Sequence, residues 1–160
     1  MIATELANEV LKLITAKSKN ISTSLGTGFC YLGFSAGDPG ANGTSFNEPN
    51  KSTYPSYARV QLNVMEAMTY TDKWGAVDAK SVELLEEITT SECLEDGGWP
   101  EFTHFGIFNA KEGGKLLAWD LLTDPDGEPD EYGQRPPKSL KINKENVAVF
   151  RTGTIRLTFK

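Results

Sequence analysis

The stretch that decides the fold is residues 102–108, which read Phe-Thr-His-Phe-Gly-Ile-Phe and form the most apolar run of the chain. Gly-Gly-Trp-Pro precedes it at 97–100, and Asn-Ala-Lys-Glu-Gly-Gly follows at 109–114. A second apolar run, residues 115–122, begins directly after these glycines. Two such runs joined by a short glycine-containing loop are typical of an antiparallel β-hairpin. The sequence therefore predicts a hairpin at the centre of a β domain.

Further strands are predicted upstream of the hairpin. Residues 29–34 are short, aromatic and flanked by glycines, which is typical of a strand buried on both faces. Residues 58–64 alternate, which predicts a half-solvated strand with Arg59 on its outward side. Residues 80–94 fit both helical and strand spacing, and we expect a short strand that runs into an irregular or helical turn.

Downstream of the hairpin, three more short apolar runs predict strands at 140–142, 147–150 and 154–159. Glycine, proline and small polar residues are concentrated in residues 37–56 and again in residues 124–137. This composition indicates two long surface loops, which are the expected places for contacts with partners.

Residues 4–16 have the periodicity of an amphipathic helix. Its apolar face consists of Leu6, Val10, Leu13 and Ile14. Short strands separated by turns favour an antiparallel arrangement with this helix at one edge or end. We therefore expect one domain over residues 1–160, mainly β: a jelly-roll-like or Ig-like β-sandwich over about 28–160 and an N-terminal α-helix over about 4–16.

Composition excludes several classes of function. The chain has 160 residues, with 16 Lys and Arg against 22 Asp and Glu, so its net charge is −6 and it is a poor candidate for gripping nucleic acid. The apolar stretch at 6–14 is interrupted by polar residues and is shorter than a membrane span requires. We expect no membrane partner.

Cys30 and Cys93 match no metal-binding spacing and are expected to be small buried hydrophobes without a disulfide.

One motif suggests catalysis. Residues 33–37 read Gly-Phe-Ser-Ala-Gly, which matches the nucleophile elbow of α/β-hydrolases around Ser35. An elbow needs a helix directly after the serine, and the Asp-Pro-Gly sequence at 38–40 cannot start one. We therefore expect Ser35 to end a strand, and His104, the single histidine, to be half-buried and hydrogen-bonded to backbone. No catalytic residue and no cofactor is predicted.

The acidic run in the second loop places carboxylates at every second residue, as calcium-binding loops do. These residues are Asp124, Asp126, Glu128 and Asp130. The positions of Pro125 and Pro129 do not fit an EF-hand, so a solvated acidic loop is favoured over a calcium site. No metal site is predicted.

Aromatic side chains near the loops have two interpretations. They either cap the ends of the core or present flat rings to sugars or to another protein. On the second interpretation the candidate contact residues are Phe46, Tyr54, Tyr57 and Trp74.

The order of several short segments resembles a family of small tailed-bacteriophage virion proteins labelled tail fibre or tail-fibre-like. The segments are residues 31–39, 48–49, 57–60, 99–108 and 113–117. The resemblance extends from about residue 5 to the end of the chain. Trp-Pro-Glu at 99–101 departs from the Trp-Gly that the family usually has, and the acidic loop at 124–132 looks like an insertion. At the start of the strand at 58–64, Arg59 is placed to bind a neighbouring carboxylate or carbonyl.

The resemblance implies a non-enzymatic structural protein of the virion, associated with the tail or tail fibre and made in the cytoplasm of the bacterial host. It implies a homo-oligomer that contacts other virion proteins. Two alternatives stay open: a host-receptor or carbohydrate-binding module, and a capsid decoration or head fibre protein on the same particle. An esterase acting through Ser35 is the remaining, remote alternative.

Overall fold

The computed structural model describes residues 30–62, 68–69, 81–84, 87–151, 154 and 156–158. These residues are mainly β, and no helix occurs among them; the helix expected at 4–16 lies outside them. The strands of the described part are β1 (Cys30–Ser35), β2 (Val60–Leu62), β3 (Met68–Thr69), β4 (Ser81–Leu84), β5 (Ile88–Thr89), β6 (His104–Phe108), β7 (Leu116–Leu121), β8 (Val149–Phe150) and β9 (Arg156–Thr158).

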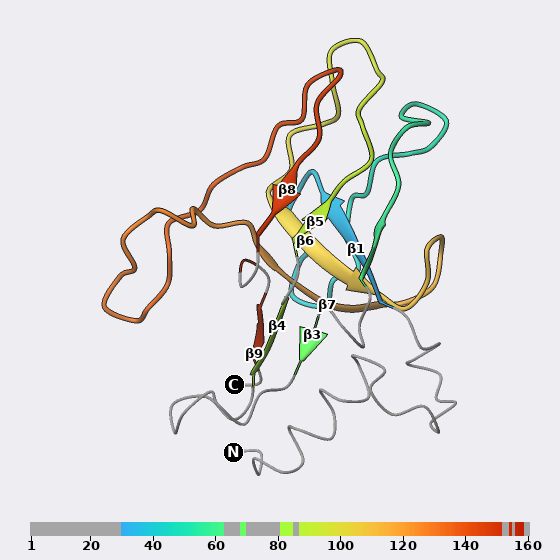
Figure 1. Ribbon diagram of the computed structural model, residues 1–160. Helices are drawn as coiled ribbons and strands as arrows, with labels where there is room; N and C mark the ends of the chain where they lie inside the picture. Colours follow the sequence, from blue (N-terminus) through green and yellow to red (C-terminus); the bar gives the residue numbers. More distant parts are fainter. Residues whose placement is uncertain are drawn as a thin grey trace.

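The described strands form three antiparallel sheets (Figure 1). The main sheet has the order β2-β1-β6-β7, the second has the order β3-β4-β9, and β5 pairs with β8. The predicted central hairpin is confirmed, because β6 pairs with β7 and sets Gly106 opposite Trp119. The predicted antiparallel β class is therefore confirmed, and the two-layer sandwich stays a prediction.

One face of the main sheet carries the core. The register of β1 and β6 sets Leu32 opposite Ile107 and Phe34 opposite Phe105, so all four side chains project from the same face. The Phe34 ring stacks on the Phe150 ring at a centroid distance of 5.5 Å, and this contact packs β8 against the main sheet. The largest fully buried side chains are Trp99, Phe34, Phe102, Leu32, Leu62 and Ile107.

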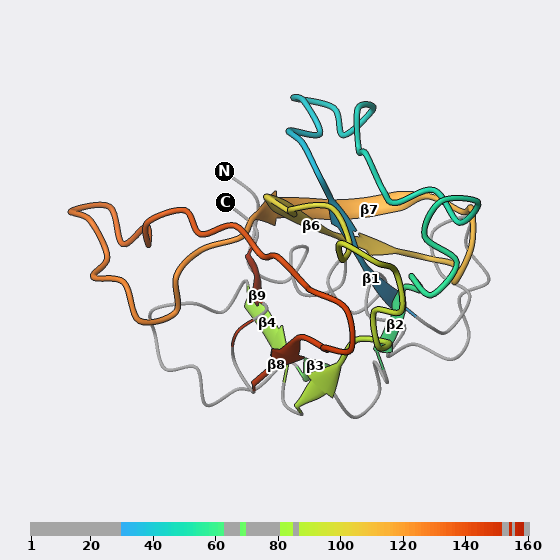
Figure 2. The same cartoon turned by 90° about the horizontal axis from the view of Figure 1, so that it is seen from above.

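The other face of the main sheet is covered by the loop that follows β1. Figure 2 shows the main sheet between this loop and β8. The loop approaches closely because Gly33 and Gly106 are cross-strand partners without side chains. A Cβ added at Gly106 would lie 2.7 Å from the Phe46 ring. β1 is therefore covered on both faces, as predicted.

The remaining expectations vary in outcome. Residues 37–56 and 124–137 contain no regular strand, as predicted for loops, and β2, β8 and β9 lie within the predicted strand segments. The segment at 80–94 holds β4, β5 and irregular chain, without a helix in its described part. Leu140 forms only an isolated bridge to Phe102, so no regular strand forms at 140–142. No helix of the described residues is long and apolar enough to cross a membrane.

Candidate functional site

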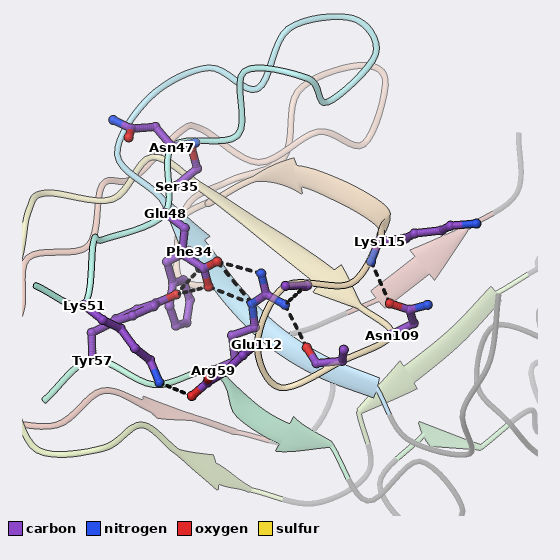
Figure 3. A network of polar contacts seen from close by, with 12 residues as sticks. Phe34, Ser35, Asn47, Glu48, Lys51, Tyr57, Arg59, Asn109, Glu112 and Lys115 are labelled. Atoms are coloured by element: carbon purple, nitrogen blue, oxygen red, sulfur yellow. Dashed lines mark hydrogen bonds and ion pairs between the residues drawn. The ribbon is translucent and has the colours of Figure 1, made fainter. Parts of the chain in front are cut away.

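Arg59 is the centre of a polar network on the loop-covered face of the main sheet (Figure 3). Its Nε donates to Glu48 Oε1 at 2.8 Å, and its Nη2 donates to Glu48 Oε2 at 2.7 Å. Its Nη1 donates to the carbonyl oxygens of Ala110 and Gly113, each at 2.7 Å. The guanidinium therefore joins the loop after β1 to the turn between β6 and β7.

The expected role of Arg59 is confirmed, because it binds both a carboxylate and carbonyl oxygens. The half-solvated strand is confirmed by exposed Gln61 and buried Leu62, but Arg59 does not face solvent. Its side chain is only 8% exposed, since the loop closes over it. Its Cζ lies 3.4 Å from the centroid of the Phe108 ring. The buried positive charge is therefore matched by a bidentate carboxylate on one side and an aromatic face on the other.

Tyr57 connects this network to the backbone of β1. Its hydroxyl donates to Glu48 Oε1 at 2.9 Å and accepts from the Phe34 N–H at 3.0 Å. Burial raises the pKa of the Tyr57 hydroxyl far above its ordinary value, and the charge of Glu48 raises it further. The hydroxyl therefore stays protonated and serves as a structural donor.

A second network lies around the Glu95 carboxylate. Glu95 accepts hydrogen bonds from the Ser56 N–H and from Trp99 Nε1, each at 2.9 Å, and from Ser56 Oγ. Burial acts to raise its pKa, but the hydrogen bonds from Ser56 and Trp99 outweigh burial and lower the pKa of Glu95 to about 2. Ionised Glu95 thus ties the end of the long loop to a fully buried tryptophan.

Cys93 is buried and free, which confirms its expected state. Its Sγ lies 3.6 Å from Glu95 Oε2, and burial raises the pKa of the thiol. No side-chain environment is described for Cys30, so the expectation for that residue stays a prediction.

Ser35 and His104 are cross-strand partners in β1 and β6, and their side chains bond to different neighbours. Ser35 is fully buried; its Oγ donates to the Gly37 carbonyl and accepts from the Asn47 N–H, each at 2.8 Å. The residues after it form a loop, so the helix of a nucleophile elbow is absent from this part of the structure. His104 is half-buried as expected, but its Nδ1 lies 2.9 Å from Thr103 Oγ1, so the expected bond to backbone is replaced by one to a side chain.

The candidate contact residues lie in different environments. Phe46 is half-buried, edge-on against Phe108 at a centroid distance of 5.2 Å. Tyr54 is half-buried against the core, and Tyr57 is only 3% exposed. Trp74 lies outside the described residues. Phe46 and Tyr57 both adjoin the Arg59 network: Phe46 contacts the Phe108 ring beneath Arg59, and Tyr57 donates to Glu48.

Sequence reasoning missed Glu48 and Glu95 as organising residues. Each is a carboxylate in an irregular segment, and nothing in its neighbouring sequence identifies a partner far along the chain. The available signal for Glu48 was its place among the few charged residues of the loop at 37–56.

The acidic loop uses two of its carboxylates to hold its own turns. Asp130 Oδ1 accepts from the backbone N–H groups of Tyr132 and Gln134, and Asp124 Oδ1 accepts from the Asp126 N–H. Hydrogen bonding to Lys138 lowers the pKa of Asp124. No group of three or more potential metal ligands occurs among the residues that the structure describes.

A cleft of about 680 Å³ lies at the base of the acidic loop. Apolar side chains from the core line it, including Phe105, Leu140 and Phe150. Three cations, Arg135, Lys138 and Arg151, line it together with a single acid, Asp126. The cleft therefore combines apolar surface with positive charge in a chain whose net charge is negative.

Comparison with protein-family models matches residues 2–128 to the family described as podophage GP4 fiber I protein gp80. The resemblance was expected to extend to the end of the chain, whereas this match ends within the acidic loop and leaves β8 and β9 beyond it. No curated protein gives a significant match. Because the matched residues make up most of the chain and the expected resemblance to tail-fibre-like virion proteins is thereby confirmed, the protein belongs to the podophage GP4 fiber I protein gp80 family.

Proposed function

We propose that this protein is a non-enzymatic structural component of a phage particle, associated with the tail or tail fibre. It acts through self-association and through contacts with other virion proteins. The observation that carries the proposal is the family match over residues 2–128. The whole chain is proposed to be one domain, with a β-sandwich and an N-terminal helix.

Rigid presentation of the loop at 37–56 supports this proposal. The buried Arg59 and Glu48 pair fastens the loop to the sheet, while residues 50–53 of the same loop are exposed. A loop held in this way loses little conformational entropy when a partner binds. We place the partner contacts of the virion role on this loop, with the half-exposed Phe46 and Tyr54 as its aromatic members and the buried Tyr57 as their support.

The environment of Ser35 supports a non-enzymatic role. Its Oγ is fully buried and already bonded to the Gly37 carbonyl and the Asn47 N–H. A nucleophile must instead reach a substrate and a general base. A simple-ester hydrolysis assay on the wild type and on Ser35→Ala is expected to show no activity in either.

The position of the protein in purified particles tests the structural role. We expect an epitope-tagged copy to co-purify with particles and to occupy repeated, symmetry-related positions in a particle reconstruction. Density on the head in place of the tail would assign the protein as a decoration or head fibre. Absence from particles, together with a monomeric mass at high concentration, would contradict the proposal.

A second candidate function is recognition of a host receptor or carbohydrate. The half-exposed ring of Tyr54 favours it, because aromatic rings on a rigid loop can stack on sugars. Glycan-array binding that is lost in Tyr54→Ala or Trp74→Ala, but kept in the surface variant Leu94→Ala, would support this candidate. Absence of binding by the wild type would reject it.

A further inference from the structure

Residues 124–137, which we call the arm, form an ordered projection from the body of the protein. The arm leaves the end of β7 and returns to it where Thr123 bridges Pro137. Both views show it extending away from the sheets (Figures 1 and 2). Its conformation is fixed internally: the Asp130 N–H donates to the Gln134 carbonyl at 2.8 Å, and Arg135 Nη1 donates to the Gly127 carbonyl at 2.9 Å. The arm is therefore preorganised without a core of its own.

The tip of the arm is acidic and carries an exposed aromatic ring. Glu128, Asp130 and Glu131 are exposed, and the neighbouring Tyr132 is 80% exposed. No Lys or Arg occurs between residues 126 and 132. Exposed tyrosines on ordered loops are frequent anchors of protein interfaces.

The cleft at the base of the arm, which we call the root cleft, has the opposite character. Arg135 and Lys138 line it while they also bind arm groups: Arg135 binds arm carbonyls, and Lys138 binds Asp124 at 3.0 Å. Arg151 also lines the cleft and is exposed, with no hydrogen bond or ion pair from its side chain to any described residue. The cleft volume of about 680 Å³ is large enough for a tyrosine ring and its flanking carboxylates.

We infer that the acidic tip of one copy's arm docks into the root cleft of a second copy. The Tyr132 ring lies against the apolar wall, and Glu128 and Glu131 face the cleft cations. We choose a second copy as the partner because its acidic arm tip is complementary in charge to the root cleft. Since each copy carries both a tip and a cleft, the contacts close into a ring or, when two copies exchange arms, into a two-fold dimer. The inference rests on the proposed self-association.

Charge reversal tests the inference on the full-length protein. The arm variant is Glu128→Lys with Glu131→Lys. The cleft variant is Arg151→Glu, which leaves the bonds of Arg135 and Lys138 to the arm intact. Glu92→Lys and Lys111→Glu are matched controls, because both residues are exposed and lie outside the arm and the cleft. Sedimentation velocity over a range of concentrations measures association, and thermal unfolding confirms that each variant is folded.

The wild type and both controls are expected to self-associate. Each charge-reversed variant should associate about a hundredfold more weakly, because like charges would then face each other across the interface. An equimolar mixture of the two variants should recover association, since the reversed arm matches the reversed cleft and the native arm matches the native cleft. Raising the salt concentration should weaken association of the wild type.

Three results would overturn the inference. They are a monomeric wild type, unchanged association in either variant, and no recovery on mixing. Binding of a polygalacturonate oligosaccharide to the cleft, lost in Arg151→Glu while association persists, would assign the cleft to an acidic sugar instead. If charge reversal does not change self-association but particles still incorporate the protein, the arm contact is rejected and the structural role is kept. If the arm contact holds and particles lack the protein, the structural role fails alone.

Discussion

At the scale of single residues, Arg59 shows how a buried charge can organise a loop. Its guanidinium is only 8% exposed, and all three of its nitrogens donate to protein acceptors. A buried ion pair contributes little net stability relative to an apolar pair, but removal of one partner leaves the other charge buried and unpaired.

Breaking this pair is therefore expected to be costly. Arg59→Ala and Glu48→Ala should each lower the free energy of unfolding by about 3 to 5 kcal/mol. The double variant should cost less than the sum of the two, because it leaves no lone charge. Urea denaturation measures all three. Lys51→Ala, which removes an exposed pair with Glu112, is the control and should change stability by less than about 1 kcal/mol. Additive costs in the double variant would contradict coupling between the two side chains.

Glu95 makes stability depend on acid pH. Its pKa is about 2 in the folded protein against an ordinary value of 4.5, so the unfolded chain binds the proton more readily. The stabilisation is fully present above about pH 4.5 and is lost as pH falls towards 2. Thermal unfolding across this range should show a steep loss in the wild type and a shallower one in Glu95→Gln. Glu92→Gln, at an exposed position outside the arm and the cleft, should keep the wild-type slope. Equal slopes in the wild type and Glu95→Gln would contradict this role.

At the scale of elements, the close approach of the loop to the main sheet depends on Gly106. Gly106→Ala places a methyl group 2.7 Å from both the Phe46 ring and the Leu116 side chain, so the loop must shift. We expect a loss of about 1 to 3 kcal/mol in the free energy of unfolding, as overpacking typically produces. Gly37→Ala is the control, because nothing lies within 4 Å of its added Cβ. Equal stability of the two variants would show that the loop is not held against the sheet.

Elements whose partners adjoin them in sequence could be predicted, whereas pairings between distant segments could not. The hairpin of β6 and β7 was predictable because its strands adjoin in sequence and its turn is rich in glycine. The pairing of β1 with both β2 and β6 was not, because periodicity identifies a strand but not its neighbours.

The candidate site was predictable only in its chemistry. The sequence indicated that Arg59 would bind a carboxylate or carbonyl, and the structure confirms this. It did not reveal that the partner is Glu48 or that the pair is buried. Burial comes from the loop folding back over Gly33 and Gly106, a contact between segments far apart in the chain.

At the scale of the whole molecule, the core joins the main sheet to segments from the second half of the chain. Trp99, Phe102 and Ile142 are buried together with Leu32 and Phe34 of β1. The mainly β class was predictable from the number of short apolar runs. The arrangement of the sheets was not, because it depends on these long-range contacts.

The alkylation rate of Cys93 measures how readily this core opens. Its side chain is fully buried, so alkylation of the native protein should be slow and should accelerate only under conditions that unfold it. Peptide mass spectrometry distinguishes Cys93 from Cys30. Leu94→Cys provides an adjacent control that should react rapidly, because Leu94 is 60% exposed. Rapid labelling of Cys93 in the native protein would show that this part of the core opens locally.

The hydrogen bonds from Arg59 to two carbonyl oxygens also lead us to predict an order of folding. Ala110 and Gly113 both lie in the turn between β6 and β7, so this turn brings the two carbonyl oxygens to one side-chain nitrogen. We therefore predict that the hairpin forms before the Arg59 contacts, and that the long loop is fixed after the rate-limiting barrier. Contacts that form after the rate-limiting barrier affect the unfolding rate and not the folding rate. In stopped-flow experiments, Arg59→Ala should accelerate unfolding and leave the refolding rate unchanged. The Arg59 contacts would then determine the lifetime of the native state.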